Sequence, residues 1–417
     1  MTVAAYPTVP LREVCESIEY GYTASSTTEP VGPRFLRITD IVPERLDWES
    51  VPFCEIEPKK LAKHRLRTGD IVIARTGATT GWAKFIKDPP DAVFASYLVR
   101  VQPAASVDAR FVGFVVESSV YKDFIQQHMG GAAQPNANAQ ILTSYEIPVP
   151  PLPVQRRIAG ILSAYDELME NSQRRIRILE AMAHSLYREW FVQFRFPGHE
   201  KLPRVASPLG DIPQGWEVKS LNDLVDDIVD YRGKTPKKLN GDWSDEGILA
   251  LSALNVKGGR LVSLEKSRCV NEDLYSRWMK NPLRRGDILM TSEAPLGELY
   301  FLCKEERYCL SQRLFSLRAN SRVIAPVILY LSMESEQTQH ELRSRASGAT
   351  VSGIRQSELR KITIVVPPRS MQERAAPILQ RLAEQKFTLD AQIQNLRQTR
   401  DLLLPRLLSG QLGIDRP

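Results

Sequence analysis

Two long stretches of the chain carry apolar residues at helical spacing. From Val154 to about Phe194, and again from Met371 to about Leu408, the apolar positions are mostly three, four or seven residues apart. The remaining positions of both stretches are rich in charge. This spacing is typical of a coiled-coil seam. We therefore predict two long helices, each with an apolar stripe that needs a partner.

The partner of each stripe is open from the pattern alone. Each helix could pack on its own globular domain, or the two helices could pack on each other. A helix of about 37 residues is roughly 55 Å long at 1.5 Å per residue, which exceeds the width of a domain of about 150 residues. The length favours helices that pair. An antiparallel pair would place the domains at opposite ends, related by an approximate two-fold axis.

The regions before the two helices alternate between strand-like and helical patterns. The runs "DIVIAR", "YLVRVQP" and "EIPVP" are short, rich in β-branched residues and bounded by Gly, Pro and Asp, and "DILMTS", "RLFSLRA" and "ITIVVP" repeat them later. Helical stretches are expected at Val112–Gln127 and Ala325–Arg345. The fold class indicated is α+β, with two similar domains of mixed helix and strand around a mostly β core.

An internal repeat fixes the organisation of the chain. "VPPLPVQRRIAGIL" begins at Val149 and "VPPRSMQERAAPIL" begins at Val366, and the Gly-Asp-Ile of residues 69–71 returns at residues 286–288, at the same offset of 217. The double proline ends a strand, because proline donates no ladder hydrogen bond. We expect a first domain at residues 1–153, a helix at 154–196, a second domain at 197–370 and a second helix at 371–417.

Composition narrows the class of protein. The 417 residues carry a net charge of +6, which is compatible with a polyanionic partner but common among ordinary proteins. The five cysteines include no C-x-x-C pair, which favours reduced thiols in the cytoplasm over a zinc site. The first residues lack the pattern of a signal peptide. No apolar run approaches the ~18 residues of a membrane span, so we expect no membrane association.

Several motifs together resemble one known family, the specificity subunits of type I restriction-modification systems. The strings that carry the resemblance are "PPLPVQRRIAGILSAYDELMENSQRRIRILE", "SLYREWFVQFRFP", "GWEVKSL", "PPRSMQERAAPIL" and "LLLPRLLSGQL". With the two Gly-Asp-Ile segments they extend over essentially the whole chain. "REWFVQF" and "LLPRLLSG" are the most specific, and each stands at the end of a predicted long helix.

The resemblance implies two target-recognition domains separated by two helices in an antiparallel coiled coil. It implies that each domain reads one half of a bipartite double-stranded DNA site, and that helix length sets the gap. It also implies binding to two modification subunits, which carry S-adenosylmethionine and adenine methyltransferase chemistry, and to restriction subunits that use ATP. The chain itself would then need no cofactor and no metal, and would be non-catalytic.

Candidate DNA contacts are polar or basic residues in loops and at strand ends. Arg and Lys suit guanine or phosphate, and amides suit adenine. The candidates are Thr23, Ser25, Arg34, Arg75, Thr79, Gln134 and Asn136 in the first domain, and Tyr231, Arg232, Lys234, Lys237, Lys238, Ser292, Arg313, Thr350 and Arg355 in the second. Glu293 occupies a related place. The basic loop "YRGKTPKK" is the clearest phosphate candidate. Each of the others could also be an ordinary solvated loop residue, and Arg75 could equally pair with Asp70.

The ends of the two helices are candidates for docking the modification subunits. They carry large apolar side chains, which dominate contacts between proteins. The candidates are Tyr187, Trp190, Phe191, Leu404, Leu407 and Leu408. Trp190 and Phe191 could instead anchor the helix end against a neighbouring domain.

Two other classes of function compete with DNA reading. A coiled-coil scaffold would not prefer any DNA sequence, and gives no reason for divergent inserts on a shared frame. An enzyme would need cofactor or metal motifs. "DPPD" at residues 88–91 ends in aspartate, where an adenine methyltransferase motif has an aromatic, and "GATTGWAK" lacks the Gly-Lys-Ser/Thr of a P-loop. Asp70 and Asp287 are predicted to be turn residues before strands.

Overall fold

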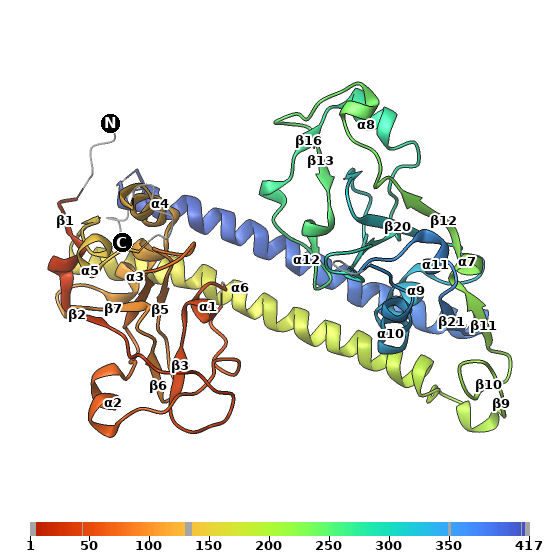
Figure 1. Cartoon of the computed structure of the whole chain (residues 1–417), viewed down its shortest axis with the longest axis horizontal. Helices are drawn as coiled ribbons and strands as arrows, with labels where there is room; N and C mark the ends of the chain where they lie inside the picture. The colour runs from red at the N-terminus through yellow and green to blue at the C-terminus, as the bar shows by residue number, and fades with distance from the viewer. Residues whose placement is uncertain (1–5, 44, 130–135, 349–351, 410, 413–417) are drawn as a thin grey trace. The chain divides into compact units, whose positions relative to one another are not determined.

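The computed structural model describes residues 6–43, 45–129, 136–348, 352–409 and 411–412. The chain divides into two compact units. The first unit comprises Met1–Asn171 and Gln392–Pro417, and the second comprises Ser172–Ala391. Two long helices, α6 (Leu152–Tyr187) and α12 (Arg369–Leu408), are each divided between the two units (Figure 1).

The first unit is built on an antiparallel sheet in the order β2-β7-β4-β5. Its strands are β2 (Cys15–Tyr20), β7 (Leu98–Pro103), β4 (Ile71–Ala74) and β5 (Ala83–Phe85). All four residues of β4 are buried, because both neighbouring strands pair with it and the sheet is covered. A parallel pair, β3 (Arg34–Leu36) with β6 (Ala92–Phe94), and an antiparallel pair, β1 (Thr8–Pro10) with β8 (Glu146–Pro148), complete the strands.

The second unit repeats this topology with different strand lengths. Its main sheet has the order β12-β20-β17-β18, formed by β12 (Val225–Asp230), β20 (Leu314–Ala319), β17 (Ile288–Thr291) and β18 (Leu299–Phe301). The parallel pair is β13 (Ile248–Leu251) with β19 (Cys309–Leu310), and the closing pair is β11 (Glu217–Ser220) with β21 (Thr363–Val366). The duplication inferred from the repeat is therefore confirmed, as are the six predicted strands.

The second unit also has short strands of its own. They are β9 (Arg204–Val205), β10 (Ile212–Pro213), β14 (Val256–Lys257), β15 (Arg260–Leu261) and β16 (Cys269–Val270). Helix α8 (Glu272–Trp278) lies in the same added region and buries Trp278 in a core cluster with Leu274 and Tyr275. The remaining short helices are α1 (Ile38–Ile41), α2 (Pro58–His64), α5 (Ala139–Leu142), α7 (Leu221–Leu224) and α11 (Gln356–Leu359).

The two helical stretches predicted between strands are each split in two. Val112–Gln127 falls on α3 (Ala109–Glu117) and α4 (Ser119–His128), and Ala325–Arg345 falls on α9 (Pro326–Glu334) and α10 (Glu336–Ser344). The break comes at Ser118 and at Ser335. Both serines have extended backbone, and each side chain accepts a hydrogen bond from the backbone three residues on, which caps a new helix. Both stretches are therefore helical, as the sequence predicts, and the pattern gave no sign of the break within each.

The long helices are held in both units by apolar packing. In the first unit, Ile158 and Leu162 of α6 share a core with Leu404 and Leu407 of α12 and with the sheet. In the second unit, the C-terminal part of α6 packs in the same core as Ala375 and Leu379 of α12. The two helices are antiparallel, and the α+β fold class with paired helices is confirmed. Both arrangements left open by the sequence are present, because the helix surfaces contact a globular core and each other.

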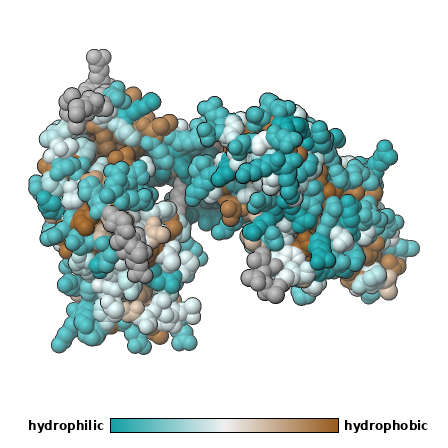
Figure 2. Space-filling view, turned by 45° about the horizontal axis from the view of Figure 1, so that its top comes forward, coloured by the Kyte–Doolittle hydropathy of each residue, from teal (hydrophilic) through white to brown (hydrophobic). Residues whose placement is uncertain are grey.

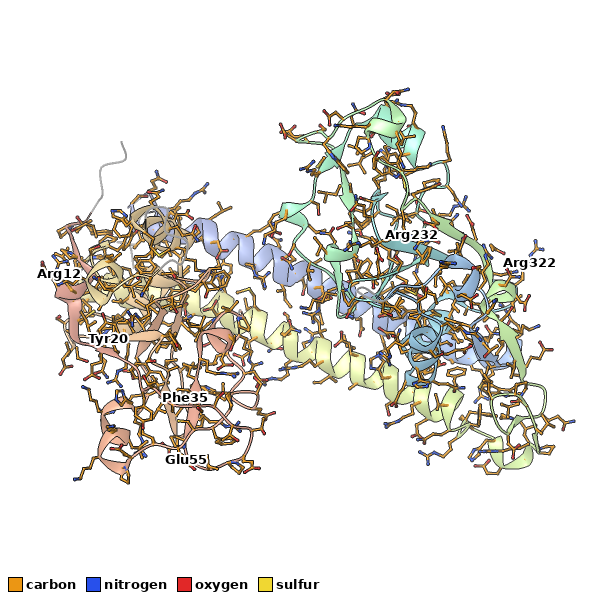
Figure 3. The ribbon with its side chains drawn as sticks, in the orientation of Figure 1. Arg12, Tyr20, Phe35, Glu55, Arg232 and Arg322 are labelled. Carbon is orange, nitrogen blue, oxygen red and sulfur yellow. The ribbon has the colours of Figure 1, made fainter. Side chains whose placement is uncertain are left out.

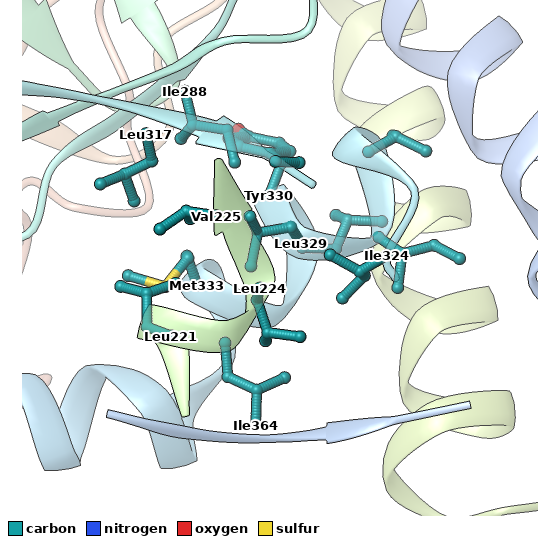
Figure 4. Close-up of a cluster of buried hydrophobic side chains, with 14 of the residues drawn as sticks. Leu221, Leu224, Val225, Ile288, Leu317, Ile324, Leu329, Tyr330, Met333 and Ile364 are labelled. Atoms are coloured by element: carbon teal, nitrogen blue, oxygen red, sulfur yellow. The ribbon is translucent and has the colours of Figure 1, made fainter. Parts of the chain in front are cut away.

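The core of the second unit lies between its sheet and α9. Ile288 and Leu317 of the sheet face Leu329 and Met333 of α9 (Figure 4). α9 is apolar on all sides, and seven of its nine residues are buried. Figure 2 shows that the visible face of the protein is mostly hydrophilic. Among the described residues, no helix combines the length and the apolar character that crossing a bilayer requires.

Candidate nucleic-acid interface

The two repeated aspartates organise the turns before the central strands. Asp70 Oδ2 accepts a hydrogen bond from the Arg67 amide at 2.9 Å, and Asp287 Oδ2 accepts one from the Arg284 amide at 2.9 Å. This confirms that both are turn residues. Both carboxylates are buried and receive donors from the neighbouring strand, which for Asp287 are two nitrogens of Arg318 at 2.9 and 2.7 Å.

The proposed pairing of Arg75 with Asp70 is wrong. Asp70 Oδ1 instead accepts from Gln102 Nε2 at 2.8 Å, and Arg100 Nη1 lies 3.5 Å from Asp70 Oδ2. Arg100 and Gln102 stand on β7, directly beside β4, whereas Arg75 follows the end of β4. Side chains of the neighbouring strand therefore partner the buried Asp70 carboxylate, and Arg75 is available for contacts at the surface.

Arg75 joins a small surface cluster in the first unit. Its Nη2 donates to Asn136 Oδ1 at 3.2 Å, and its guanidinium lies 4.8 Å from the centre of the Tyr20 ring. The Tyr20 hydroxyl accepts from the Ala139 amide at 3.0 Å. Tyr97, whose carbonyl accepts from the Arg75 amide at 3.0 Å, is 60% exposed. The structure thus brings together the predicted residues Arg75 and Asn136, and adds Tyr20 and Tyr97 to them.

Strand register identifies the residue of the second unit that is equivalent to Tyr20. Tyr20 is paired with Val99, which also pairs with Ile73 of the central strand. In the second unit, Phe315 takes the place of Val99, since it pairs with both Asp230 and Met290. Asp230 therefore occupies the position of Tyr20. Figure 3 labels Tyr20 and Arg232, which stand at and just beyond the ends of these equivalent strands.

Backbone contacts extend the equivalence to the loops. The Ser292 amide donates to the Arg313 carbonyl at 2.9 Å, as the Arg75 amide does to the Tyr97 carbonyl. The isolated bridge between Thr76 and Asn136 returns between Glu293 and Gly353. One backbone frame thus presents Tyr20, Arg75, Thr76, Tyr97 and Asn136 in the first unit. In the second unit it presents Asp230, Ser292, Glu293, Arg313 and Gly353.

The frame in the second unit borders an open, polar cleft. The cleft has a volume of ≈ 390 Å³ and is lined by Asp230, Arg232, Gly233, Glu293, Gln312 and Arg313. Arg232 makes a bidentate pair with Asp230, with both contacts at 2.8 Å, and stacks 4.0 Å from the Phe315 ring centre. Arg313 Nε lies 3.0 Å from Glu293 Oε1. Two arginine–carboxylate pairs therefore face this cleft.

The basic loop at Tyr231–Lys238 is more engaged with the protein than its sequence indicated. Lys234 Nζ donates to the Trp278 carbonyl at 2.7 Å, and burial lowers the pKa of this lysine. Lys238 Nζ donates to the Gly233 carbonyl at 2.9 Å, while Lys237 is exposed. The Tyr231 hydroxyl accepts from the Asn281 amide at 2.9 Å. Lys237 and Lys238 remain the most accessible cations of the loop.

The other predicted DNA contacts differ in their accessibility. Thr23, Ser25 and Arg355 are exposed, and Thr79 is half-buried. Arg34 Nη1 donates to the carbonyls of Glu49 and Val51, and its guanidinium lies 4.1 Å from the Phe53 ring centre, so it supports the fold. Ser292 is buried, and its hydroxyl has no hydrogen-bond partner among the described residues. Gln134 and Thr350 lie outside the described residues.

The predicted docking residues at the helix ends are mostly used inside their own units. Phe191 is buried against Trp216, and the Tyr187 hydroxyl donates to Ser332 Oγ at 2.9 Å. Trp190 is half-buried. Leu404 and Leu407 are buried in the core of the first unit, with Leu408 packed beside them. Their docking role stays a prediction.

Two observations in the described parts of the chain concern metal binding and thiol reactivity. No group of three or more His, Cys, Asp or Glu side chains is placed to hold a metal ion within the described parts of the chain. Burial raises the pKa of Cys15, Cys303 and Cys309 to about 12 and that of Cys54 to about 11. These thiols are therefore poor nucleophiles at neutral pH.

The sequence signal for the added cluster members was weak. Tyr20 and Asp230 each end a strand, and Tyr97 stands in the turn before another, so each fits an ordinary structural pattern. Their nearness to Arg75 or Arg313 comes from strand pairing between segments far apart in the chain. Aligning the two copies at their offset would have placed Thr76 on Glu293, but not Tyr20 on Asp230, because the spacing changes between the copies.

Comparison with known proteins shows the family to which the chain belongs. The family model of the type I restriction modification DNA specificity domain matches residues 6–181 and again residues 213–397. The chain therefore carries two DNA specificity domains. It belongs to the family of type I restriction-modification specificity subunits, which contribute recognition and no catalysis.

Individual relatives agree with this assignment. The MjaIX specificity subunit of Methanocaldococcus jannaschii is 25% identical over 359 residues, covering 85% of this chain and 78% of that protein. The HindI specificity subunit of Haemophilus influenzae is 22% identical and covers 86% of this chain and 91% of its own length. The crystal structure of an S subunit from M. genitalium superposes with a TM-score of 0.59 at 14% identity, covering 98% of this chain and 97% of that one, which shows a shared fold.

Proposed function

We propose that this chain directs a type I restriction-modification complex to a bipartite, asymmetric DNA site, with one half read by each unit. The observation that carries the proposal is the repeated backbone frame with different side chains. Tyr20, Arg75 and Asn136 stand in one copy where Asp230, Ser292 and Gly353 stand in the other. A fixed frame with exchanged hydrogen-bonding groups is what two readers of different sequences require.

The chemistry of the first frame suits base edges. A guanidinium can donate two hydrogen bonds to guanine, and an amide can pair with adenine in the same way. The Tyr20 ring and Asn136 hold the Arg75 guanidinium in place, which reduces the rotamer freedom lost on binding. Lys237, Lys238 and the excess of basic residues in the chain would supply contacts to phosphate.

The partners follow from family membership and remain part of the proposal. Two modification subunits would bring S-adenosylmethionine and methyltransferase chemistry, and restriction subunits would bring ATP-dependent cleavage. The complex would act on double-stranded DNA in the cytoplasm. A coiled-coil scaffold with no DNA preference is not favoured, because both units match a DNA specificity domain.

Methylated-base sequencing tests the proposal. The full chain is co-expressed with its modification subunits in a host that lacks other adenine methylation, and methyladenine is read in its sequence context. We expect one split motif with two unlike halves. Replacing residues 1–153 by the first domain of another family member should change one half only. Methylation with no sequence context, or a change in both halves, would contradict the proposal.

A further inference from the structure

We propose that Arg313 and Glu293 together read one G·C base pair in the half-site of the second unit, an inference that rests on the proposed function. Arg313 would donate to guanine O6 and N7, and Glu293 would accept from the N4 amino group of the paired cytosine. These three atoms lie side by side on the major-groove edge of a G·C pair. An adjacent cation and carboxylate match that donor and acceptor order.

The backbone holds both side chains at the edge of the cleft. Arg313 has a positive φ of 63°, which an arginine adopts only under constraint. The Arg313 carbonyl accepts a hydrogen bond from the Ser292 amide at 2.9 Å, which ties the residue to the end of the central strand. Glu293 bridges to Gly353, where an added Cβ would lie 3.1 Å from the Glu293 Cβ. A side chain at residue 353 would therefore crowd Glu293.

The exposure of the two ion pairs distinguishes which arginine is available to DNA. The side chains of Arg313 and Glu293 are 50% and 37% exposed and make one short contact. Those of Arg232 and Asp230 are 30% and 26% exposed and make two, and Arg232 also stacks on Phe315. An exposed pair with a single contact is weak. Arg313 and Glu293 can therefore break their contact at small cost and form hydrogen bonds to base edges instead. Arg232 and Asp230 stay paired with each other as part of the frame.

The carboxylate is the informative member of the pair. A glutamate facing DNA is repelled by the phosphates, and a hydrogen bond that it accepts from a base offsets this repulsion. Cytosine N4 and adenine N6 are the major-groove donors, and the neighbouring guanidinium selects the pair that contains guanine. The first unit has Thr76 and Tyr97 at the positions of Glu293 and Arg313. Its half-site should therefore not require a G·C pair at the corresponding place.

Selection from a duplex library tests the inference on the full chain assembled with its modification subunits. Both half-sites are randomised, and bound duplexes are sequenced. For Glu293→Gln we expect the preference for cytosine at one position of one half-site to fall by about 10-fold or more. Arg313→Lys, which keeps the charge but loses the fork, should weaken the preference at the same base pair. Glu305→Gln, at an exposed site outside the cleft, is the matched control.

The outcomes separate this inference from the proposed function. If the wild-type complex selects no split sequence, the proposed function itself fails. If it selects a split sequence, and Glu293→Gln leaves the preference at every position unchanged, only the reading by Glu293 is overturned. The same holds if the two variants affect different base pairs, or if a variant with wild-type thermal unfolding loses all DNA binding. The half-site read by the first unit reports whether each variant complex is intact.

Discussion

Gln155 and Gln372, which occupy the same place in the two copies, make the same buried hydrogen bonds. Gln155 Nε2 donates to the Pro150 carbonyl at 2.8 Å, and its Oε1 accepts from the Asp108 amide at 2.8 Å. Gln372 Nε2 donates to the Pro367 carbonyl at 3.0 Å, and its Oε1 accepts from the Ala325 amide at 2.8 Å. Each glutamine therefore ties the start of a long helix to the double proline and to the start of α3 or α9.

The first prediction follows from this buried amide. Gln372→Ala removes a donor and an acceptor, so the Ala325 amide and the carbonyls of Pro367 and Val323 lose this partner. We expect the free energy of unfolding of the second unit to fall by about 1–3 kcal/mol, measured by urea denaturation. Hydrogen exchange should also speed up near Ala325. Gln337→Ala, on the exposed side of α10, is the control. Equal losses for the two variants would contradict the prediction.

The second prediction concerns a carboxylate shared by two arginines in the first unit. Asp166 of α6 lies 2.5 Å from Arg110 Nη2 and 2.7 Å from Arg400 Nη1 of α12, and all three side chains are about three-quarters buried. Asp166→Asn keeps the shape but removes the charge between two guanidinium groups. We expect a loss of about 1–3 kcal/mol in the unfolding of the first unit.

The control for this carboxylate is one residue away. Glu167 is exposed on the same helix, so Glu167→Gln should change the stability by no more than about 0.5 kcal/mol. Urea denaturation compares the two variants under identical salt conditions. If Asp166→Asn were as stable as Glu167→Gln, the contacts to Arg110 and Arg400 would not stabilise the helix pair.

The third prediction is a pH dependence in the second unit. The hydrogen bond to Glu334, at 3.2 Å, raises the pKa of His184 above its ordinary value of 6.5. A raised pKa in the folded state stabilises the fold fully below pH 6.5, and this stabilisation is lost as the pH rises through the folded pKa. The side chain of His184 is 59% exposed, so solvent screening limits the effect to at most about 1 kcal/mol.

Urea denaturation at about pH 6 and about pH 8 measures this effect. The wild-type chain should lose more stability between the two values than His184→Gln does. Glu334→Gln should reduce the difference in the same way, because it removes the acceptor that raises the pKa. A double variant should add nothing further. The prediction is wrong if His184→Gln retains the wild-type dependence.

The repeat made much of the fold accessible from the sequence. Strands such as β4 and β17 are short runs of buried β-branched or apolar residues that follow the same Gly-Asp turn, so both copies supported one assignment. The helix breaks at Ser118 and Ser335 were missed because apolar periodicity continues across them. The capping hydrogen bonds of these serines stop the helix, and they leave no trace in the hydrophobic pattern.

The candidate site was predicted only in part. Arg75 and Asn136 are polar residues after recognisable strands, so each was found singly. Their contact and the Tyr20 ring above the guanidinium depend on strand register. The accessibility of Lys234 was overestimated, since the Trp278 carbonyl to which it donates lies 44 residues away along the chain. Neither contact is encoded locally.

The fourth prediction tests the frame of the first unit. Arg75→Lys keeps the positive charge but loses the planar fork that guanine recognition uses. We expect discrimination at one base of one half-site to fall by about 1–3 kcal/mol, with the salt dependence of binding unchanged. Library selection and salt titration measure the two effects. Arg12→Lys, at an exposed position labelled in Figure 3, is the control. A lower salt slope with unchanged discrimination would assign Arg75 to phosphate.

The last prediction concerns the long helices as the element that sets the gap between half-sites. Deleting four residues from α6, with four matched residues from α12, shortens the pair by roughly 6 Å at 1.5 Å per residue. That length corresponds to about two base pairs at 3.4 Å each. We expect the gap in the methylated motif to shorten while both half-sites keep their sequence. Replacing the same residues by alanine preserves the helix length and should preserve the gap. If the half-site bases changed while the gap stayed the same, the helices would be acting on the readers and not on their separation.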